Sequence, residues 1–344
     1  MTEPTSTNKH PLVTVLMPVY NAEEFVETAI QSILEQTYKN FELLIMDDGS
    51  TDDSAAIILA IDDSRISYIK NDVNLKLITT LNKGLKLAKG KYIARLDADD
   101  IAEKTRLQEQ VDFMEANPKV GLSGTWYTAF GTKNSTVKNP TQNQDIRYMA
   151  LYQCPIIHPS TIFRTSVIRD NNLSYNMDYP HAEDYELWCR FAQVSELANI
   201  PSILLKYRLH ETNVSKLENP TQAANTLRIK TELFENIGVA VTPEELKLFE
   251  RLNHHVVDFS ESDLVQLGRF LTKLVLANNS SSYLEPAYLT QLLKRKWYET
   301  CSNHYFLGWK SWKIYWNEPQ ISASSSFNIG SLKLLIKSIR GQFS

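Results

Sequence analysis

Apolar and polar positions follow two alternating periods through the first third of the chain. Residues 12–19 form an apolar, β-branched run, and residues 22–36 then repeat apolar positions at helical spacing. The same order recurs in the pairs 41–48 and 53–63, 66–70 and 78–90, and 91–97 and 102–117. This alternation predicts an α/β fold, Rossmann-like, with a mainly parallel sheet flanked by helices and ligands at the carboxyl ends of the strands.

The pattern loosens after residue 120. Residues 156–168 read as a strand that enters a helix, 182–193 as a helix and 202–210 as a strand. Beyond about residue 215, helical patterns such as 244–259 replace the alternation. We therefore expect a first domain over residues 1–215 and a mainly helical C-terminal region over 216–344.

Composition and charge exclude several classes of protein. The chain has 344 residues, 43% of them hydrophobic, and its 36 Lys and Arg against 40 Asp and Glu give a net charge of −4, so no overall field recruits nucleic acid. Cys154, Cys189 and Cys301 are far apart, which argues against structural zinc and predicts buried thiols in a reducing compartment. The N-terminus lacks an apolar signal region and no apolar run is long enough to span a membrane, so we expect a cytoplasmic protein that can still be peripheral at the inner face of the plasma membrane.

Acidic residues cluster where such a sheet places its functional groups. Asp97, Asp99 and Asp100 follow the fourth strand, residues 47–52 follow the second, and residues 183–184 lie in a later helix. Burying these carboxylates without partners would cost several kcal/mol, whereas oxygen ligands with few protein contacts suit Mg²⁺ or Mn²⁺ held together with a diphosphate. The positions predict one shared crevice.

Other interpretations of residues 97–100 exist. A calcium-binding EF-hand loop is excluded, because Ala102 and Gln108 stand where that loop needs Gly and Glu. A polar strand end that caps the next helix and an aspartyl nucleophile both remain open.

The segments 18–21 ("PVYN") and 47–52 ("DDGSTD") end the first two strands. The second contains a turn at Gly49 and residues able to cap a helix. Neither GxGxxG nor GxxxxGK[ST] occurs in the chain, so these segments offer carboxylates for base or ribose recognition without a glycine-rich phosphate loop.

Six ordered motifs resemble the family 2 glycosyltransferases, which have the GT-A fold. They are "PVYN", "DDGSTD", "LNKGLKLAKGKYIARLDADD", "HPSTIFR", "AEDYELWCR" and "YRLHETNVS". The resemblance implies an inverting, metal-dependent transfer, of hexosyltransferase type, from a nucleotide diphosphate-sugar to an acceptor hydroxyl of a glycan or lipid-linked glycan in bacterial surface-polysaccharide synthesis. A UDP-sugar is favoured, because Asp48 can accept a hydrogen bond from uracil.

The resemblance also implies roles for individual residues. Those expected to hold the nucleoside are Pro18, Val19, Tyr20, Asn21, Asp47 and Asp48. Those expected at the ribose and the Mn²⁺ or Mg²⁺ ion are Asp97, Asp99 and His210, with Asp100 either orienting Asp99 or capping a helix, and with Arg164 and Arg208 as candidates to steady phosphate. Asp184 matches the catalytic base and is expected to be ionised at an ordinary pKa of about 3.9, while Glu183 and His158 are assigned to the acceptor side.

The chain departs from the family pattern in one place. Asn74, Leu75 and Lys76 stand where the family often has Asn-x-Gly, so a glycine-dependent backbone approach is replaced or lost. The absence of a QxxRW-type motif favours single addition over polymerisation. Two other functions remain open, a non-catalytic module that binds sugar nucleotides or glycans, and a sugar-phosphate nucleotidyltransferase.

Aromatic and basic residues gather near the C-terminus. Trp297, Trp309, Trp312 and Trp316 are interleaved with Lys and Arg in residues 294–316, and the last three share one helical face. Residues 331–344 carry an apolar stripe, formed by Leu332, Leu335, Ile336, Ile339 and Phe343. Residues 294–344 therefore predict contact with a membrane surface or, equally, packing against the catalytic domain or in an oligomer.

Overall fold

The computed structural model describes residues 12–210, 220–254 and 258–322. The chain divides into two compact units, one formed by residues 1–150 and 154–227 and the other by 151–153 and 228–344. The boundary expected near residue 215 lies outside the described residues and stays a prediction.

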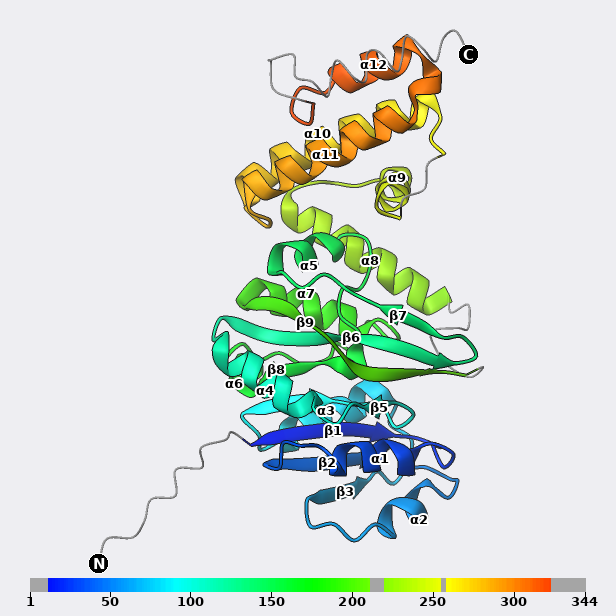
Figure 1. Ribbon diagram of the computed structural model, residues 1–344, viewed down its shortest axis with the longest axis vertical. Helices are drawn as coiled ribbons and strands as arrows, with labels where there is room; N and C mark the ends of the chain where they lie inside the picture. Colours follow the sequence, from blue (N-terminus) through cyan, green and yellow to red (C-terminus); the bar gives the residue numbers. More distant parts are fainter. Residues whose placement is uncertain (1–11, 211–219, 255–257, 323–344) are drawn as a thin grey trace, which may run out of the picture. The chain divides into compact units, whose positions relative to one another are not determined.

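The first unit is built on one nine-stranded sheet. Its strands are β1 (Val13–Val19), β2 (Phe41–Asp47), β3 (Ile66–Lys70), β4 (Tyr92–Arg95), β5 (Ile101–Ala102), β6 (Val120–Gly131), β7 (Ser135–Val137), β8 (Ile162–Arg164) and β9 (Glu196–Leu209) (Figure 1). They lie in the order β3-β2-β1-β4-β8-β6-β9-β5, and β7 pairs with β6. The α/β fold class is confirmed.

The sheet is mixed, so the expected mainly parallel pairing holds for only half of it. The pairs among β1, β2, β3 and β4 are all parallel, whereas β4–β8, β5–β9, β6–β7 and β6–β8 are antiparallel and β6–β9 is parallel. Antiparallel pairing needs no crossover helix. The antiparallel pairs accordingly involve strands from the part of the chain where the regular strand-helix alternation is lost.

In the described part of the first unit, eight complete helical segments and the beginning of a ninth, residues 220–227, accompany the sheet. The complete segments are α1 (Val26–Leu34), α2 (Ser54–Leu59), α3 (Leu77–Leu87), α4 (Arg106–Ala116), α5 (Asn143–Met149), the 3₁₀ turn η1 (His158–Ser160), α6 (Thr165–Asp170) and α7 (Glu183–Val194). Helix α1 begins four residues later than the apolar spacing predicts. The amides of Ala22 and Glu23 instead bind the side chains of Ser54 (2.8 Å) and Asp52 (3.0 Å), which holds this segment as a turn against the end of β2.

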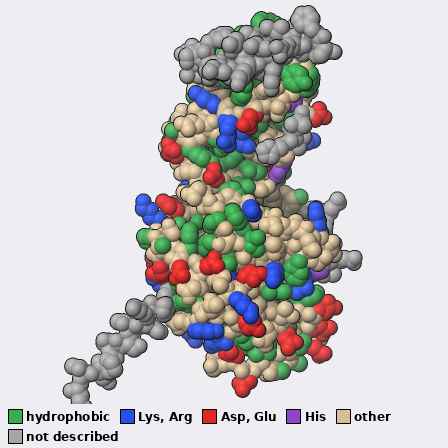
Figure 2. Space-filling model, in the orientation of Figure 1, with side chains coloured by type: hydrophobic (Ala, Val, Ile, Leu, Met, Phe, Trp, Pro, Cys, Tyr) green, Lys and Arg blue, Asp and Glu red, His purple; other side chains and the backbone are tan. Residues whose placement is uncertain are grey.

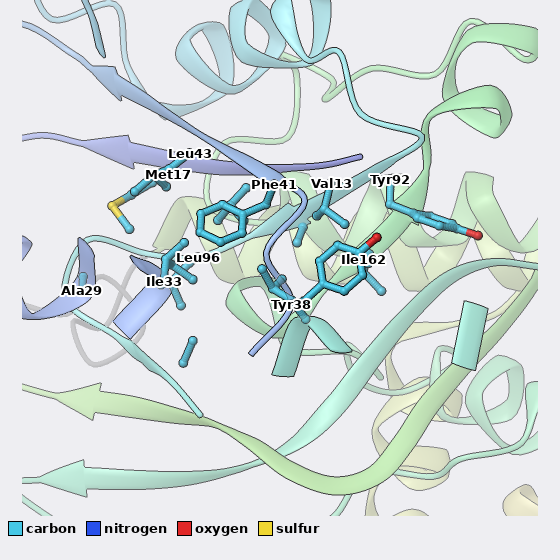
Figure 3. Packing of buried hydrophobic residues seen from close by; sticks show 14 of the residues in the cluster. Val13, Met17, Ala29, Ile33, Tyr38, Phe41, Leu43, Tyr92, Leu96 and Ile162 are labelled. Carbon is cyan, nitrogen blue, oxygen red and sulfur yellow. The ribbon is translucent and has the colours of Figure 1, made fainter. Parts of the chain in front are cut away.

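Alternate residues of β1 face two apolar cores. Val15 and Met17 pack in a cluster with α1 and α4 on one face of the sheet. Figure 3 shows Met17 on the side of Ala29 and Ile33 of α1. Leu16 points to the opposite face, where α3 and α7 cover it. Because both faces are covered, β1 is buried along its whole length, which explains its continuous apolar run.

The second unit is helical, as expected. Its elements are α9 (Pro243–Asn253), α10 (Glu261–Ser281), α11 (Pro286–Asn303), the 3₁₀ turn η2 (Tyr305–Leu307) and α12 (Trp309–Trp316), together with the part of α8 (Pro220–Ile237) that follows residue 227. Thr242 and Ser260 form capping boxes that begin α9 and α10. Phe234, Phe249 and Phe270 meet edge to face in the core.

None of the helices in the described parts of the chain combines the length and the apolar character needed to cross a bilayer. On the face shown in Figure 2, acidic and basic side chains are interspersed, in keeping with the nearly balanced composition. The predicted apolar stripe of residues 331–344 lies outside the described residues.

Candidate active site

The ends of β1 and β2 bring the two predicted nucleoside segments into contact. Val19 pairs with Asp47, and the amide of Asp48 donates to the Val19 carbonyl (2.8 Å). Asn21 lies beyond Val19, Pro18 and the half-exposed Tyr20, and its Oδ1 accepts from the Thr51 amide (2.9 Å). The juxtaposition of these segments is confirmed, while their role in holding a nucleoside stays a prediction.

The two acids of the second segment are both used by the protein itself. Asp47 is fully buried, and its Oδ1 accepts from the Ser50 amide (2.8 Å) while its Oδ2 accepts from the Tyr68 hydroxyl (2.6 Å). Asp47 therefore shapes the turn that follows β2. Both carboxylate oxygens of Asp47 already accept hydrogen bonds from the protein. Its predicted contact with a nucleoside therefore stays a prediction.

Asp48 organises the neighbouring loop through one oxygen. Its Oδ1 accepts from the Asn71 side chain (2.9 Å), the Leu75 amide (2.8 Å) and the Thr80 hydroxyl (2.8 Å). Within the described residues, Oδ2 receives no hydrogen bond. Asp48 can thus hold the loop with one oxygen and bind a ligand N–H with the other.

Lys76 occupies the position where the family pattern often has glycine. Its backbone adopts φ 70° and ψ 157° just before α3, a region that side chains with a Cβ rarely adopt. Its amide donates to Asn74 Oδ1 (2.9 Å), and the neighbouring Leu75 amide is held by Asp48. The loop therefore has a glycine-like backbone without a glycine.

The carboxylates after β4 form a compact cluster. Asp97, Asp99 and Asp100 can each present an oxygen within 4.8 Å of the other two. Arg95 binds both oxygens of Asp97, and His210 Nε2 lies 2.9 Å from Asp99 Oδ2. The structure thus brings together the four residues that the sequence assigned to the cation site or its margin.

Asp100 is the buried member of this cluster. Its Oδ1 accepts from the Arg208 amide (2.8 Å), and its Oδ2 is buried without a partner among the described residues. The alternative that Asp100 caps the next helix is wrong, because α4 begins at Arg106 after Thr105 and receives no side-chain cap. An unpartnered carboxylate oxygen aimed into a protein interior is costly unless a cation approaches it.

The electrostatics of the cluster also suit a cation. Burial, together with the neighbouring charge of Asp99, raises the pKa of Asp97 to about 6 even though Arg95 opposes the shift. Burial and the charges of Asp97 and Asp99 raise the pKa of Asp100 well above its ordinary value. A divalent ion reverses such shifts and satisfies the oxygens, so the residues present fit Mg²⁺ or Mn²⁺.

Arg95 is a site residue that the sequence reasoning missed. It is only 3% exposed, and besides binding Asp97 its charge partly offsets the burial that raises the pKa of both Glu183 and Asp184. A signal was available, because Arg95 interrupts an apolar strand two residues before Asp97, and residues two apart share one face of a strand.

The two arginines predicted to bind phosphate, Arg164 and Arg208, both make contacts within the protein. All three guanidinium nitrogens of Arg164 are engaged inside the protein, where Nε donates to the Val120 carbonyl (2.8 Å) and Nη1 to the Tyr92 hydroxyl (2.9 Å). Arg208 lies over the rings of Phe25 (4.7 Å) and Phe130 (4.6 Å) and donates from Nε to the Asp99 carbonyl (2.8 Å). Arg208 therefore orders the carboxylate loop.

Asp184 lies in the first turn of α7. Its Oδ1 accepts from the Tyr185 amide (2.7 Å), and the Cys154 thiol lies 3.9 Å from its Oδ2. Burial, followed by the charge of Glu183, raises the pKa of Asp184 to about 7. The expectation of an ordinary pKa near 3.9 is wrong, because the helix places this carboxylate in a poorly hydrated site beside a second acid.

Three further predictions concern buried groups. Cys189 and Cys301 are buried as expected, but Cys154 is only partly buried, because it lines the site beside Asp184. His158 is buried, with Nε2 2.8 Å from the Tyr175 hydroxyl, and burial lowers its pKa well below the ordinary value. His158 is therefore neutral, and its acceptor-side role, like that of the buried Glu183, stays a prediction.

Comparisons with known proteins agree with this geometry. Residues 14–173 match the family described as Glycosyl transferase family 2. An uncharacterized glycosyltransferase of Haemophilus influenzae is 37% identical over 235 residues, which cover 64% of this chain and 73% of that protein. The Escherichia coli protein WfgD, a UDP-Glc:alpha-D-GlcNAc-diphosphoundecaprenol beta-1,3-glucosyltransferase, is 34% identical over 59% of this chain and 79% of its own length.

Two solved structures share the fold at low sequence identity. Residues 1–349 of S. aureus TarS, in complex with UDP-GlcNAc, match with a TM-score of 0.56 and 16% identity over 85% of this chain and 86% of that chain. The mannosyltransferase PcManGT of Pyrobaculum calidifontis, in complex with GDP-Man and Mn²⁺, matches with a TM-score of 0.51 and 16% identity over 96% and 87%. The strand order and these likenesses show a GT-A-like α/β fold. The family match and the Haemophilus influenzae relative show that the chain belongs to glycosyltransferase family 2.

Replacing Lys76 by glycine tests the strain in the loop beside Asp48. Relief of an unfavourable backbone conformation is worth about 1–3 kcal/mol, and the added freedom of glycine in the unfolded chain offsets about 0.5–1 kcal/mol of this. We expect Lys76→Gly to raise the free energy of unfolding by about 1 kcal/mol in urea titrations. Lys76→Ala removes the charge but keeps the Cβ, so an equal gain in that variant would contradict the strain argument.

The raised pKa of Asp184 has a consequence for stability. The folded state keeps this carboxyl protonated up to about pH 7, whereas the unfolded chain ionises it near 3.8, so its contribution to stability falls as pH rises between these values. Asp184→Asn lacks this loss. Since one pKa unit corresponds to about 1.4 kcal/mol, we expect the variant to be more stable than the parent by that amount or more at pH 8, and by little at pH 4.

Urea unfolding at several pH values measures the difference. Asp170→Asn is the matched control, because Asp170 is an exposed acid at the end of α6 in the same unit. A stability difference for Asp184→Asn that does not change between pH 4 and 8 would show that its pKa is ordinary.

Proposed function

We propose that this protein transfers a sugar, with inversion, from a UDP-sugar to a hydroxyl of a lipid-linked glycan in polysaccharide synthesis, using Mn²⁺ or Mg²⁺. One observation carries the proposal. Asp97, Asp99 and Asp100 can each present an oxygen within 4.8 Å of the other two, and Asp100 Oδ2 is buried without a partner among the described residues, which suits a cation held together with a diphosphate. The charge of Arg95 acts on Asp97 and on Asp184 alike, so a donor bound at the cluster would present its sugar toward Asp184.

The relatives support the finer parts of the proposal. The name of WfgD gives its donor as UDP-glucose and its acceptor as a diphosphoundecaprenol-linked sugar. The same donor and acceptor appear in the name of Escherichia coli WfaP, which is 34% identical over 63% of this chain and 86% of its own length. The presence of Mn²⁺ with GDP-Man in PcManGT is compatible with a metal role for this fold.

The carboxylate cluster would hold the cation and the donor. Asp99 and the unpartnered oxygen of Asp100 are suited to bind the ion directly, whereas Asp97 is oriented by Arg95. A divalent ion held by these residues would supply positive charge that stabilises the leaving diphosphate. His210, which already contacts Asp99, would join or adjust this coordination.

Asp184 would act on the acceptor. As the acceptor oxygen bonds to the anomeric carbon, the bond from that carbon to the diphosphate oxygen breaks, and the hydroxyl proton passes to Asp184. Oδ2 is the better placed oxygen, because Oδ1 already accepts from the Tyr185 amide. A pKa of about 7 makes this carboxylate a stronger base than an ordinary aspartate, and transfer should rise with pH through that value.

Two other functions make different demands. A non-catalytic binding module needs no base beside the donor site. A sugar-phosphate nucleotidyltransferase needs the cation but has no use for an acid pair facing it. The proximity of residues 183–184 to the cluster favours transfer over both.

Asp184→Asn separates an enzyme from a binding module. Asparagine keeps the shape of the side chain and its bond to the Tyr185 amide, but it cannot take a proton. Because general-base assistance contributes about 10²–10⁴-fold, we expect sugar transfer to fall by that factor while donor affinity stays nearly unchanged. Transfer is measured with a radiolabelled UDP-sugar and a lipid-linked acceptor, with Asp170→Asn as control.

The outcomes are distinct. Transfer at the parental rate would reject Asp184 as the base and turn attention to Glu183. A collapse of donor affinity would place Asp184 in the donor site. If neither parent nor variant transfers sugar from any donor in a panel that stabilises the protein, the binding module becomes the better explanation.

Asp99→Ala tests the metal role. Without this carboxylate, a cation should no longer support donor binding, and the diphosphate would face Asp97 with less neutralising charge. In the parent, we expect Mn²⁺ to increase the affinity for UDP-sugars, measured by thermal stabilisation. In Asp99→Ala, we expect the affinity measured with Mn²⁺ to be at least tenfold lower than in the parent. Asp62→Ala, at an exposed loop position, is the control. Donor affinity in Asp99→Ala that equals the parent's, with and without chelator, would refute the role.

A further inference from the structure

The second unit carries an aromatic patch, formed by Tyr305, Phe306, Trp309, Trp312 and Trp316. Tyr305 is 44% exposed, Phe306 60% and Trp309 49%. Trp309 and Trp312 stack with ring centroids 5.0 Å apart and planes 7° apart. The expected sharing of one helix face by the three tryptophans of α12 is thus confirmed, and the face is partly open to solvent.

The opposite face of α12 fixes this orientation. Ser311 is fully buried and donates to the Cys301 carbonyl (2.7 Å), while Ile314 and Tyr315 are buried beside it. The indole of the fully buried Trp297 donates to the Tyr315 carbonyl (3.4 Å). The fold therefore buries a serine and leaves Trp309, two residues away, half-exposed.

The preceding turn η2 is held just as firmly. His304 is buried, with Nδ1 2.7 Å from the Thr300 carbonyl and Nε2 accepting from the Phe259 amide (3.2 Å). Tyr305 and Phe306 follow directly and project outward. Exposure of three large aromatic residues within five positions is therefore built into the structure, and contiguous exposed apolar surface of this kind marks a contact site.

The basic residues of α12 indicate the kind of contact. Residues 294–316 hold five basic residues (Lys294, Arg295, Lys296, Lys310 and Lys313) and one acid, Glu299, and of these Lys310 and Lys313 lie on α12 with the tryptophans. Lys313 is exposed on α12 among the tryptophans, and Lys310 pairs with Glu261 (2.7 Å). A positive surface complements an anionic one.

The exposed rings of the patch also carry polar groups. The Tyr305 hydroxyl and the Trp309 indole N–H belong to side chains that are 44% and 49% exposed. Tryptophan and tyrosine prefer the boundary between lipid and water, where the ring is in an apolar environment and the N–H or O–H reaches a headgroup. Lysines interleaved with such rings add attraction to anionic headgroups.

We propose that the aromatic patch docks this protein on the surface of an anionic lipid bilayer. The aromatic rings of η2 and α12 enter the headgroup region, and Lys313 contacts lipid phosphates. This inference rests on the second unit alone and holds whether or not the proposed transfer reaction is correct.

Vesicle binding by the full chain tests the proposal without donor or acceptor. The vesicles contain phosphatidylglycerol and phosphatidylcholine, at low ionic strength, where electrostatic attraction is strongest. We expect co-sedimentation with these vesicles and a blue shift of tryptophan emission. The double variant Phe306→Ser, Trp309→Ser should lower the partition coefficient at least tenfold, because two large apolar side chains no longer leave water.

Charge and position are tested separately. Lys313→Ala should weaken binding about fivefold on anionic vesicles and leave binding to pure phosphatidylcholine unchanged, since one basic residue near an anionic surface is worth about that factor. Leu59→Ser, at a residue 67% exposed on α2, and Lys247→Ala, at an exposed position of α9, are the matched controls and should bind like the parent. Circular dichroism and thermal unfolding establish that each variant is folded.

Three results would overturn the proposal. The first is that the parent does not bind anionic vesicles at low salt, and the second is that the folded double variant binds them as well as the parent does. Light scattering would instead identify the patch as a contact between two copies of the chain if it found a dimer that the double variant loses, with no vesicle binding. Because the assay contains no sugar nucleotide, its failure is independent of any failure of sugar transfer.

Discussion

The buried guanidinium of Arg95 offsets the mutual repulsion of the carboxylates in the candidate active site. The carboxyl ends of the strands and the start of α7 bring Asp97, Asp99, Asp100 and the acid pair at 183–184 into one electrostatic neighbourhood. Burial lowers the pKa of Arg95, but the charges of Asp97 and Asp100 more than offset this, so it stays charged. Removing such a charge from a buried network is costlier than its pairwise contact suggests, because the remaining acids lose their counterion.

Hydrogen bonds also fix the backbone of Arg95. Its amide donates to the Thr161 carbonyl (2.9 Å), and its carbonyl accepts from the guanidinium of the fully buried Arg106 (2.7 Å). Burial lowers the pKa of Arg106 to about 9, although Asp100 opposes the shift. A second buried arginine thus holds the strand that carries the first, and it explains why α4 begins with a charged residue that faces inward.

The sequence pattern predicted the N-terminal, parallel half of the sheet, where the burial of each strand depends on its own residues. The apolar periods of residues 12–97 identified β1 to β4 and the helices between them, because burial of both faces leaves a continuous signature along each strand. The twelve-residue β6 and the antiparallel pairs depend on partners far away in sequence, which no local period encodes. The late start of α1 has the same origin, since Ser54 and Asp52 bind its preceding amides from thirty residues away.

The site divides in a similar way. The acidic residues were identifiable from their place at strand ends and from the family motifs, but their states depend on neighbours that only the fold assembles. Asp184 shows this most clearly, because its first-turn position alone would stabilise an ionised carboxylate. Burial and the adjacent Glu183 outweigh that stabilisation and leave the pKa at about 7. A raised pKa lowers the stability of the fold once the carboxyl ionises, above neutral pH. The same raised pKa makes the carboxylate a stronger base, so the property that is unfavourable for folding is the one that suits Asp184 to take a proton.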